Sequence, residues 1–394
     1  MLKKTGFTYS HTIYASYLGY ITQAIVNNFA PLLFLTFGRE FGLTLSQITL
    51  ITTLNFAVQL IVDLLSTKFV DRIGYRVSVV AAHLFAAAGL VMLAVLPGVL
   101  GAYPGILAAV VFYAVGGGLI EVLISPIVEA CPTEKKEAAM SLLHSFYCWG
   151  HLAVILLSTL FFTAFGIGSW RVLAVLWALL PLFNSLFFSR VPIYSITGGH
   201  EPMPLGKMLR SRVFWLLMAI MVCAGASEQA MSQWASAFAE SALQVSKTVG
   251  DLAGPCAFAL LMGTARALYG KYSDGIPLKK MMLGCAALCI AAYLLAALSP
   301  SPALGLIGCA VCGFSVGIFW PGTFSIAALR MPGAGTAMYA LMALAGDVGC
   351  SGGPTVVGLV ADAAGGRLQA GLLAAILFPV VILAGISRIK QVEK

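Results

Sequence analysis

The chain has 394 residues, of which 60% are hydrophobic and only 10% are charged. Soluble domains carry about a quarter charged residues and less than half apolar ones, so this composition excludes a soluble globular protein. The formal net charge is +8, but the basic residues are scattered among short loops, which argues against nucleic-acid binding. At about 20 apolar residues per span, the length accommodates about a dozen helices. The sequence therefore predicts an all-α polytopic membrane protein.

Hydropathy and the charged or Gly/Pro breaks predict twelve membrane-spanning segments. Their approximate ranges are 12–37, 45–69, 77–98, 103–128, 138–165, 170–189, 214–240, 248–270, 279–298, 303–329, 335–361 and 368–387. The longest polar interruption follows the sixth segment, so we predict a six-helix half over 1–190, a cytoplasmic linker over 191–212 and a second half over 213–394. The first segment lacks a small-residue cleavage signal, and we expect it to remain in the protein.

The placement of Lys and Arg predicts the orientation. With the N-terminus in the cytoplasm, 18 basic residues lie in cytoplasmic segments and four lie outside, while Arg266 falls within a span. The opposite topology would invert the positive-inside rule. We therefore expect both termini to lie on the cytoplasmic side of a cell membrane.

A repeat is visible at an offset of about 200 residues. The segment Thr67-Lys-Phe-Val-Asp71-Arg72-Ile-Gly74-Tyr-Arg76 follows the second span, and Gly270-Lys-Tyr-Ser-Asp274-Gly275-Ile-Pro277-Leu-Lys279 follows the eighth. Two parallel six-helix halves are the plan of many secondary transporters, which alternate access to a site between the halves. Channels and membrane enzymes are also duplicated in some cases, so the repeat alone leaves these classes open.

The loop after the second span resembles the GxxxDRxGxR signature of the major facilitator superfamily, with Thr67 in place of its first glycine. The resemblance covers the whole chain and implies two pseudo-symmetric six-helix halves that form a transporter and not an enzyme. It also implies that charged residues near this loop help to close the cytoplasmic side. The candidates for this gate are Asp63, Asp71, Arg72, Arg76, Arg266 and Asp274, although separate local partners for Asp63 and Arg266 fit the sequence equally well.

Glu121 is the foremost candidate for a proton carrier. A charged group within a span costs about 2.5–3.5 kcal/mol or more, which makes such groups functional candidates. Glu121 lies eight residues before Glu129, about 12 Å into the membrane at 1.5 Å per residue, and His144 reaches a similar depth on the next span. Desolvation favours the protonated carboxyl group, and an imidazole can share or relay the proton. The alternative is a Glu–His pair that only joins two helices.

Three segments resemble the fucose permease-like branch of the superfamily. They are Gly116-Gly-Gly-Leu-Ile-Glu121-Val-Leu-Ile-Ser-Pro126, Leu143-His144-Ser-Phe-Tyr147-Cys-Trp-Gly150 and Gly225-Ala-Ser-Glu228-Gln229 with Trp234. This resemblance implies proton coupling at Glu121 and solute contacts from His144 and Tyr147. Asn28 stands where that branch has an aspartate, so coupling through two carboxylates does not carry over.

Uncharged polar residues predict a hydrophilic solute. Amide pairs four residues apart share a helix face in the first and seventh spans. Amides and an aromatic ring suit a sugar, whose hydroxyl groups need partners and whose faces stack, whereas the alternative use of such amides is to join helices. The candidate solute contacts are Gln23, Asn27, Asn28, Tyr147, Glu228, Gln229, Gln233, Trp234 and Trp320, the last of which is equally suited to packing.

Asp347, near the middle of the eleventh span, is a candidate second ion site. The sequence has no Walker loop, nucleophile elbow or metal-ligand cluster, which argues against ATP-driven transport and catalysis. We predict a monomeric secondary transporter that moves a small polar solute, a sugar above all, with protons and without a cofactor. Sodium coupling, a multidrug or metabolite exporter, a lipid flippase and a transporter-like nutrient sensor remain alternatives.

Overall fold

The computed structural model describes residues 6–133, 136–194, 205–272, 277–331 and 335–389, and the side chains of Asp71 and Arg72 also lie outside the description. Twelve helical segments of the described residues are long and apolar enough to cross a membrane. They are Tyr9–Phe41, Leu45–Ser66, Tyr75–Val99, Ala102–Val128, Leu142–Phe165, Ile167–Arg190, Arg212–Ser241, Lys247–Tyr269, Leu278–Leu298, Pro302–Ala327, Leu341–Ala363 and Leu368–Arg388. The predicted number and order of the spans are confirmed.

The chain forms two compact units, of residues 1–43 with 54–198 and of residues 44–53 with 199–394. The first unit contains α1 (Tyr9–Asn28), η1 (Ala30–Leu33), α2 (Phe34–Phe41), most of α3 (Leu45–Ile73), α4 (Tyr75–Val99), α5 (Ala102–Glu129), α6 (Lys136–Phe165), η2 (Ile167–Ser169) and α7 (Trp170–Arg190). Much of the predicted linker falls outside the described residues, and the division at 191–212 stays a prediction.

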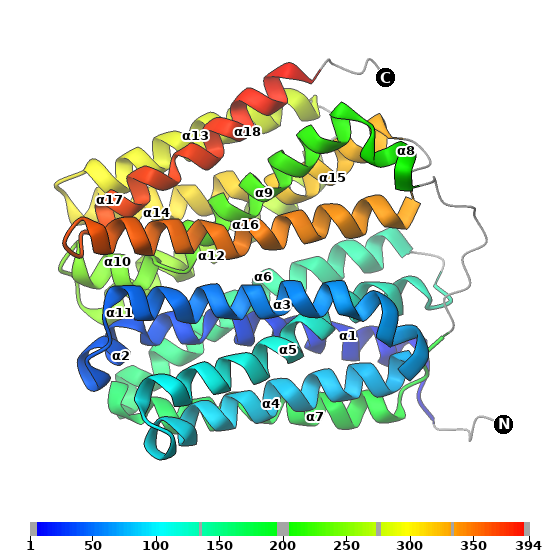
Figure 1. The fold of residues 1–394 in the computed structure, drawn as a ribbon, viewed down its shortest axis with the longest axis horizontal. Helices are drawn as coiled ribbons and strands as arrows, with labels where there is room; N and C mark the ends of the chain where they lie inside the picture. The colour runs from blue at the N-terminus through cyan, green and yellow to red at the C-terminus, as the bar shows by residue number, and fades with distance from the viewer. Residues whose placement is uncertain (1–5, 134–135, 195–204, 273–276, 332–334, 390–394) are drawn as a thin grey trace. The chain divides into compact units, whose positions relative to one another are not determined.

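The second unit contains the remaining helices, which Figure 1 colours from green to red. They are α8 (Leu205–Leu209), α9 (Arg212–Ser232), α10 (Ala235–Ser241), α11 (Lys247–Asp251), the π-helix η3 (Leu252–Cys256), α12 (Ala257–Tyr272), α13 (Leu278–Leu298), α14 (Pro302–Val316), α15 (Phe319–Arg330), α16 (Gly335–Ala363), α17 (Leu368–Ala375) and α18 (Leu377–Arg388). Residues 44–53 belong here because they pack on α16, where Ser46 donates to Asp362.

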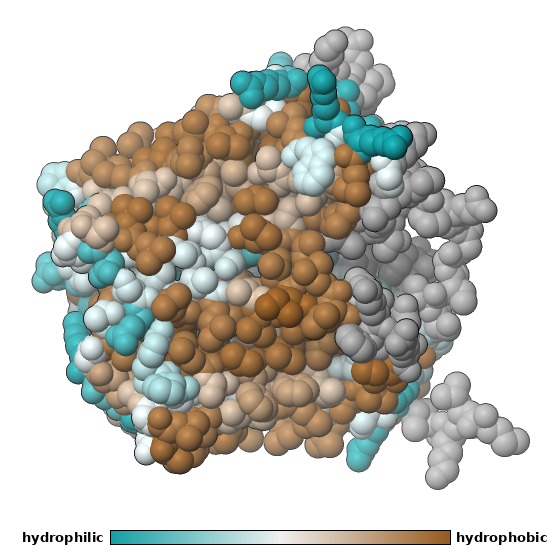
Figure 2. Space-filling model, viewed as in Figure 1, coloured by the Kyte–Doolittle hydropathy of each residue, from teal (hydrophilic) through white to brown (hydrophobic). Residues whose placement is uncertain are grey.

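Large apolar side chains remain exposed on the outside of the helices, as a lipid environment requires. On α7, for example, Leu179, Phe183 and Leu186 are each more than half exposed. Figure 2 shows apolar residues spread over the helices and hydrophilic residues gathered mainly toward the helix ends. This pattern is that of a membrane protein and would be unfavourable in water.

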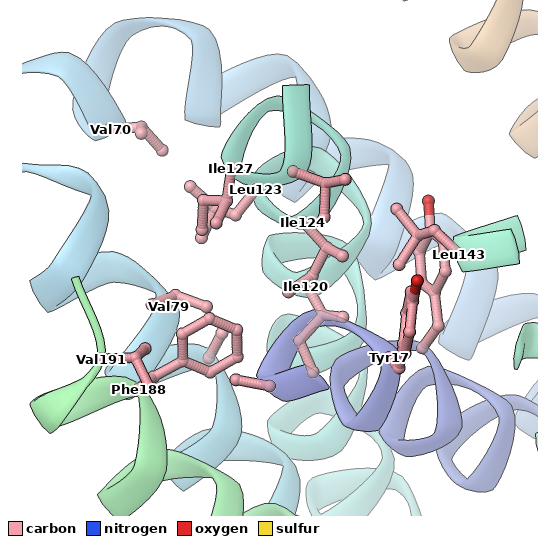
Figure 3. Packing of buried hydrophobic residues seen from close by; sticks show 14 residues of the cluster. Tyr17, Val70, Val79, Ile120, Leu123, Ile124, Ile127, Leu143, Phe188 and Val191 are labelled. Carbon is pink, nitrogen blue, oxygen red and sulfur yellow. The ribbon is translucent and has the colours of Figure 1, made fainter. Parts of the chain in front are cut away.

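The core of the first unit joins six helices, including α3 through Val70. Tyr17 of α1, Val79 of α4, Ile120 of α5, Leu143 of α6 and Phe188 of α7 belong to one buried apolar cluster (Figure 3). The cluster fixes α5 against α1, and α5 carries Glu121.

Several of the described spans are interrupted, and three of these breaks lie beside candidate functional residues. The first span passes through η1, which contains Pro31, the seventh span breaks at Gln233 and Trp234 between α9 and α10, and the tenth breaks at Gly317 and Ile318 between α14 and α15. A break leaves backbone carbonyl groups without their helical partners, and in transporters such points are common near binding sites. Predicted polar residues lie beside these breaks, with Asn27 and Asn28 at the first and Gln229 and Gln233 at the seventh.

Close packing of α4 on α5 depends on glycine. A Cβ atom at Gly89 would lie 2.3 Å from the backbone nitrogen of Tyr113, whereas one at Gly98, on the same helix, would meet nothing within 4 Å. We therefore expect Gly89→Ala to lower the free energy of unfolding by about 1–3 kcal/mol through overpacking.

The matched control is Gly98→Ala, which we expect to leave stability unchanged or raise it by up to about 1 kcal/mol, because alanine favours the helix. Retention of monodisperse protein after heating in detergent measures both variants. Equal stability of the two variants would contradict this account of the α4–α5 contact.

Candidate functional site

A run of three glycines brings Glu121 against its neighbours. A Cβ at Gly116 would lie 2.5 Å from the backbone nitrogen of Ala86 on α4, and one at Gly117 would lie 3.2 Å from Oε1 of Gln23 on α1. One at Gly118 would lie 3.0 Å from the Cα of Gln59 on α3. Because α5 lacks side chains here, it approaches three helices at once, and the carboxyl group one turn later reaches a partly buried position.

The Glu121 carboxylate accepts a hydrogen bond from a buried amide. Nε2 of Gln23 donates to Oε2 of Glu121 at 2.8 Å and also to Oε1 of Gln59 at 3.0 Å. Gln23 and Gln59 are each only 2% exposed. The helices α1, α3 and α5 are thus joined by one polar contact inside the first unit.

The contact continues along α3 toward the break in the first span. Nε2 of Gln59 donates to Oδ1 of Asn27 at 2.8 Å and to Oδ1 of Asn55 at 3.1 Å. Nδ2 of Asn55 donates to Oδ1 of Asn27 at 3.1 Å. We call these five residues, Gln23, Asn27, Asn55, Gln59 and Glu121, the amide–carboxyl network. Its four amide side chains are buried and Glu121 is partly buried. Such bonds between membrane helices each contribute about 0.6–2 kcal/mol.

His144 lies near the network through Tyr20. The ring centres of Tyr20 and His144 are 5.4 Å apart, and the Tyr20 hydroxyl is 2.9 Å from Oγ of Ser125, one turn after Glu121 on α5. Tyr20 therefore contacts both the helix that carries the carboxyl group and the side chain of the histidine. His144 itself is exposed. The predicted exchange of a proton between Glu121 and His144 stays a prediction.

The second unit contains a different charged centre. Glu228 on α9 and Arg266 on α12 form an ion pair at 3.4 Å, with side chains 10% and 21% exposed. Nε of Arg266 donates to the carbonyl oxygen of Gly317 at the break in the tenth span, at 3.3 Å. Gln229 donates to the other carboxylate oxygen of Glu228, and Gln233 donates to Gln229. The guanidinium group thus neutralises a buried carboxylate and satisfies a carbonyl group that the break has freed.

A family profile described as Major Facilitator Superfamily matches residues 16–354. The chain belongs to the major facilitator superfamily. Membership and the twelve-span fold together make it a multi-pass membrane transporter of small solutes, as the loop signature predicted.

Individual relatives in the superfamily are distant. The membrane protein MosC of Rhizobium meliloti is 26% identical over 263 residues, which cover 66% of this chain and 62% of that protein. The match thus spans less than two thirds of this relative's length. The Escherichia coli fucose:proton symporter has a TM-score of 0.68 at 16% identity, with 96% of this chain and 98% of that chain covered.

Bacterial homologues of the human lysosomal transporter Spinster share the same fold. An inward-facing, unoccupied structure has a TM-score of 0.77 at 16% identity, and an inward-facing, occupied structure has one of 0.74 at 15% identity. Each alignment covers 96% of both chains. At these identities the structural matches establish the superfamily fold and leave the solute to be argued from the residues.

Other predicted solute contacts have local partners in this structure. Asn28 donates to the carbonyl oxygen of Ala24 on its own helix, and the fully buried Trp234 donates to the carbonyl oxygen of Pro354. A Cβ at Gly346 would lie 2.1 Å from the Trp320 ring, so this ring packs on the backbone of α16. Tyr147 lies 6.5 Å from the ring of His151, measured between centres. Their roles toward a solute stay predictions.

The gate candidates are dispersed. Arg76 donates to the carbonyl oxygens of Phe188 and Ser189, both at 2.9 Å, which stabilises the C-terminal end of α7. Of the two interpretations of Arg266, the structure shows the local partner, Glu228. Asp274 and the side chains of Asp71 and Arg72 lie outside the described residues, Asp63 is partly buried, and Asp347 is 6% exposed.

Sequence reasoning missed three polar residues. Asn55 and Gln59 are spaced four apart like the amides of the first and seventh spans, and that spacing was the available signal. Asp251 is fully buried, where it accepts hydrogen bonds from Ser236 and from Lys247, four residues before it. The i,i+4 spacing of Lys247 and Asp251 was likewise visible in the sequence.

The Glu228–Arg266 pair supplies a test of the second unit. Removing one partner leaves a buried charge uncompensated, so we expect Arg266→Gln and Glu228→Gln each to lower the free energy of unfolding by about 3–5 kcal/mol. We expect the double variant to lose much less than the sum of the two, because neither charge remains.

Thermal unfolding of the purified variants in detergent measures this coupling. The matched control is Arg171→Gln, which breaks the more exposed Arg171–Glu40 pair and should cost less than about 1 kcal/mol. Additive losses at Glu228 and Arg266 would contradict a coupled pair.

Proposed function

We propose that this transporter moves a small polar solute of the sugar class together with protons, by alternating access in the cell membrane, with both termini in the cytoplasm. It acts as a monomer and needs no cofactor beyond the coupling ion. The observation that carries the proposal is the partly buried Glu121 carboxyl group within a membrane-spanning helix, which is hydrogen-bonded to a neutral amide.

The surroundings of Glu121 favour proton exchange. An ionised carboxylate in a membrane-spanning helix is unfavourable unless it is paired or hydrogen-bonded, and protonation removes this cost. The amide of Gln23 stabilises the ionised form by a hydrogen bond, and because it is neutral it adds no charge of its own to hold the carboxyl group ionised. Glu121 can therefore take up a proton on one side of the membrane and release it on the other.

Glu228 provides the contrast. Its carboxylate accepts from the guanidinium group of Arg266 and from the Gln229 amide, so both of its oxygens have donors and its charge is balanced. Protonation of Glu228 would leave the Arg266 charge uncompensated. Of these two glutamates, Glu121 is the one suited to carry the proton, and Glu228 is suited to hold Arg266 at the break in the tenth span.

The amide side chains beside the breaks indicate the class of solute. Asn27 in the first unit and Gln229 and Gln233 in the second lie beside breaks in their spans. Amide groups offer both donors and acceptors, as hydroxyl groups require. The three segments that resemble the fucose permease-like branch point the same way, and the fucose:proton symporter among the structural matches makes L-fucose a rational first probe.

Proteoliposomes with an internal pH dye test the proposal. We expect addition of the correct member of a sugar panel, beginning with L-fucose, to drive protons inward through the wild-type protein. We expect Glu121→Gln to reduce this proton entry to the level of protein-free liposomes while solute exchange persists, because a neutral amide at this position mimics the permanently protonated carboxyl group. The matched control, Glu240→Gln near the end of α10, should retain proton entry.

Each rival function gives a different result in the same vesicles. Undiminished proton entry through Glu121→Gln would contradict the assigned carrier. Proton exit on solute entry would indicate an antiporter of the exporter class. Movement of labelled lipid without any sugar-induced pH change would indicate a flippase.

A further inference from the structure

We propose that Gln59 is a positioning residue that transmits the protonation state of Glu121 to Asn27 and Asn55 through the orientation of their amide groups. The inference rests on the proposed role of Glu121 as the proton carrier. It assigns to α3 a part in coupling that neither the loop signature nor the resemblance to the fucose permease-like branch gives it.

The five hydrogen bonds described above for the amide–carboxyl network run in one direction. An ionised carboxylate can only accept, so Gln23 must turn its NH2 group toward Glu121. The same NH2 group donates to Oε1 of Gln59, which fixes the Gln59 amide with its own NH2 group toward Asn27 and Asn55. The orientation of each amide is therefore set by the one before it, beginning at the carboxylate.

An unsatisfied oxygen atom supports this direction of the hydrogen bonds. Oε1 of Gln23 is buried and has no hydrogen-bond partner among the residues that the structure describes. Rotating the Gln23 amide by half a turn would place this oxygen against Oε2 of Glu121 and Oε1 of Gln59, which are both acceptors in the present arrangement. The bond from Gln23 to a charged carboxylate is stronger than a neutral one, and it holds the amide in its present orientation despite the unsatisfied oxygen.

Protonation of Glu121 removes that bias. The neutral carboxyl group becomes a donor through its O–H and a weaker acceptor, so Oε1 of Gln23 can turn to accept from it. The Gln59 amide then has to turn as well, so that its NH2 group donates to Gln23 and its oxygen faces Asn27 and Asn55. The only covalent change is the gain of a proton by the Glu121 carboxylate. Each amide of the network then exchanges the positions of its NH2 group and its oxygen, up to Asn27 at the break in the first span.

Other titratable groups lie on the helices packed around Glu121. They include Tyr20 on α1, Asp63 on α3, His83 on α4, Tyr113 on α5, and His144, Tyr147 and His151 on α6. The His83 ring is bonded to the carbonyl oxygen of Val79 and to Asn184. We call the transmission from Glu121 through Gln59 to Asn27 and Asn55 the relay. A test of the relay must distinguish titration of Glu121 from titration of any of these other groups.

The small number of asparagines makes that test direct. The chain has four, Asn27, Asn28, Asn55 and Asn184. Of these, only Asn27 and Asn55 belong to the network, while Asn28 is bonded to its own helix and Asn184 to His83. The experiment uses full-length protein with 15N-labelled asparagine in liposomes without solute. NMR follows the side-chain signals of the asparagines, and infrared spectroscopy follows the band of protonated carboxyl groups over the same pH range. Asn27→Ser and Asn55→Ser assign the signals.

In the wild type we expect the Asn27 and Asn55 signals to follow pH with the same midpoint as the carboxyl band, and the Asn28 signal to stay constant. Glu121→Gln should abolish both changes. In Gln59→Leu, and in the second variant Gln59→Met, the carboxyl band should persist while the two asparagine signals lose their pH dependence. Gln47→Leu, on the same helix but outside the network, should behave as the wild type.

Three results would overturn the relay. The first is that the Asn27 and Asn55 signals still follow pH in both Gln59 variants. The second is that these signals still follow pH in Glu121→Gln. The third is that the carboxyl band is lost in both Gln59 variants. The first of these would leave the proposed function intact. Absence of a Glu121 carboxyl band in the wild type at any pH would instead remove the proposed function along with the relay.

Discussion

The hydrogen bond from Gln23 to Glu121 is the interaction on which the rest of this account depends. It places an ionisable group inside a membrane-spanning bundle and gives it a neutral partner. A carboxylate held by an arginine would remain ionised, and one with no polar partner would remain protonated. An amide leaves both forms accessible, which is the property that a proton carrier needs.

The two units use the carboxylates within their membrane-spanning helices differently. In the first, the carboxyl group ends a chain of amides that leads to the break in the first span. In the second, the carboxylate of Glu228 is balanced by Arg266, which is also bonded to the carbonyl oxygen of Gly317 at another break. The sequence repeat thus preserves the helical plan while the polar chemistry of the two halves has diverged, one half suited to titration and the other to a fixed charge pair.

Much of the fold could be predicted from the sequence, because the membrane requires long apolar helices and the loop signature after the second span is specific. Glu121 could be found because a carboxyl group within an apolar run is unusual. The partner of Arg266 could not be found in this way, because Glu228 is 38 residues away in the chain and only the packing of α9, α12 and α14 brings the two together. The breaks at Trp234 and Gly317 could not be predicted either, because the hydropathy of an apolar segment does not show whether its helix is interrupted. Asn55 and Gln59 have the spacing of the other amide pairs, but only the packing of α3 on α1 brings them against Gln23 and Asn27.

The most direct test of the central claim compares Glu121 and Glu228 in one molecule. Dicyclohexylcarbodiimide reacts with protonated carboxyl groups in apolar surroundings, and mass spectrometry of the labelled protein identifies the residue modified. We expect labelling of Glu121 to increase as the pH is lowered, while Glu228, paired with Arg266, stays unlabelled over the same range. Labelling of Glu228 in preference to Glu121, or labelling of Glu121 that does not change with pH, would contradict the central claim.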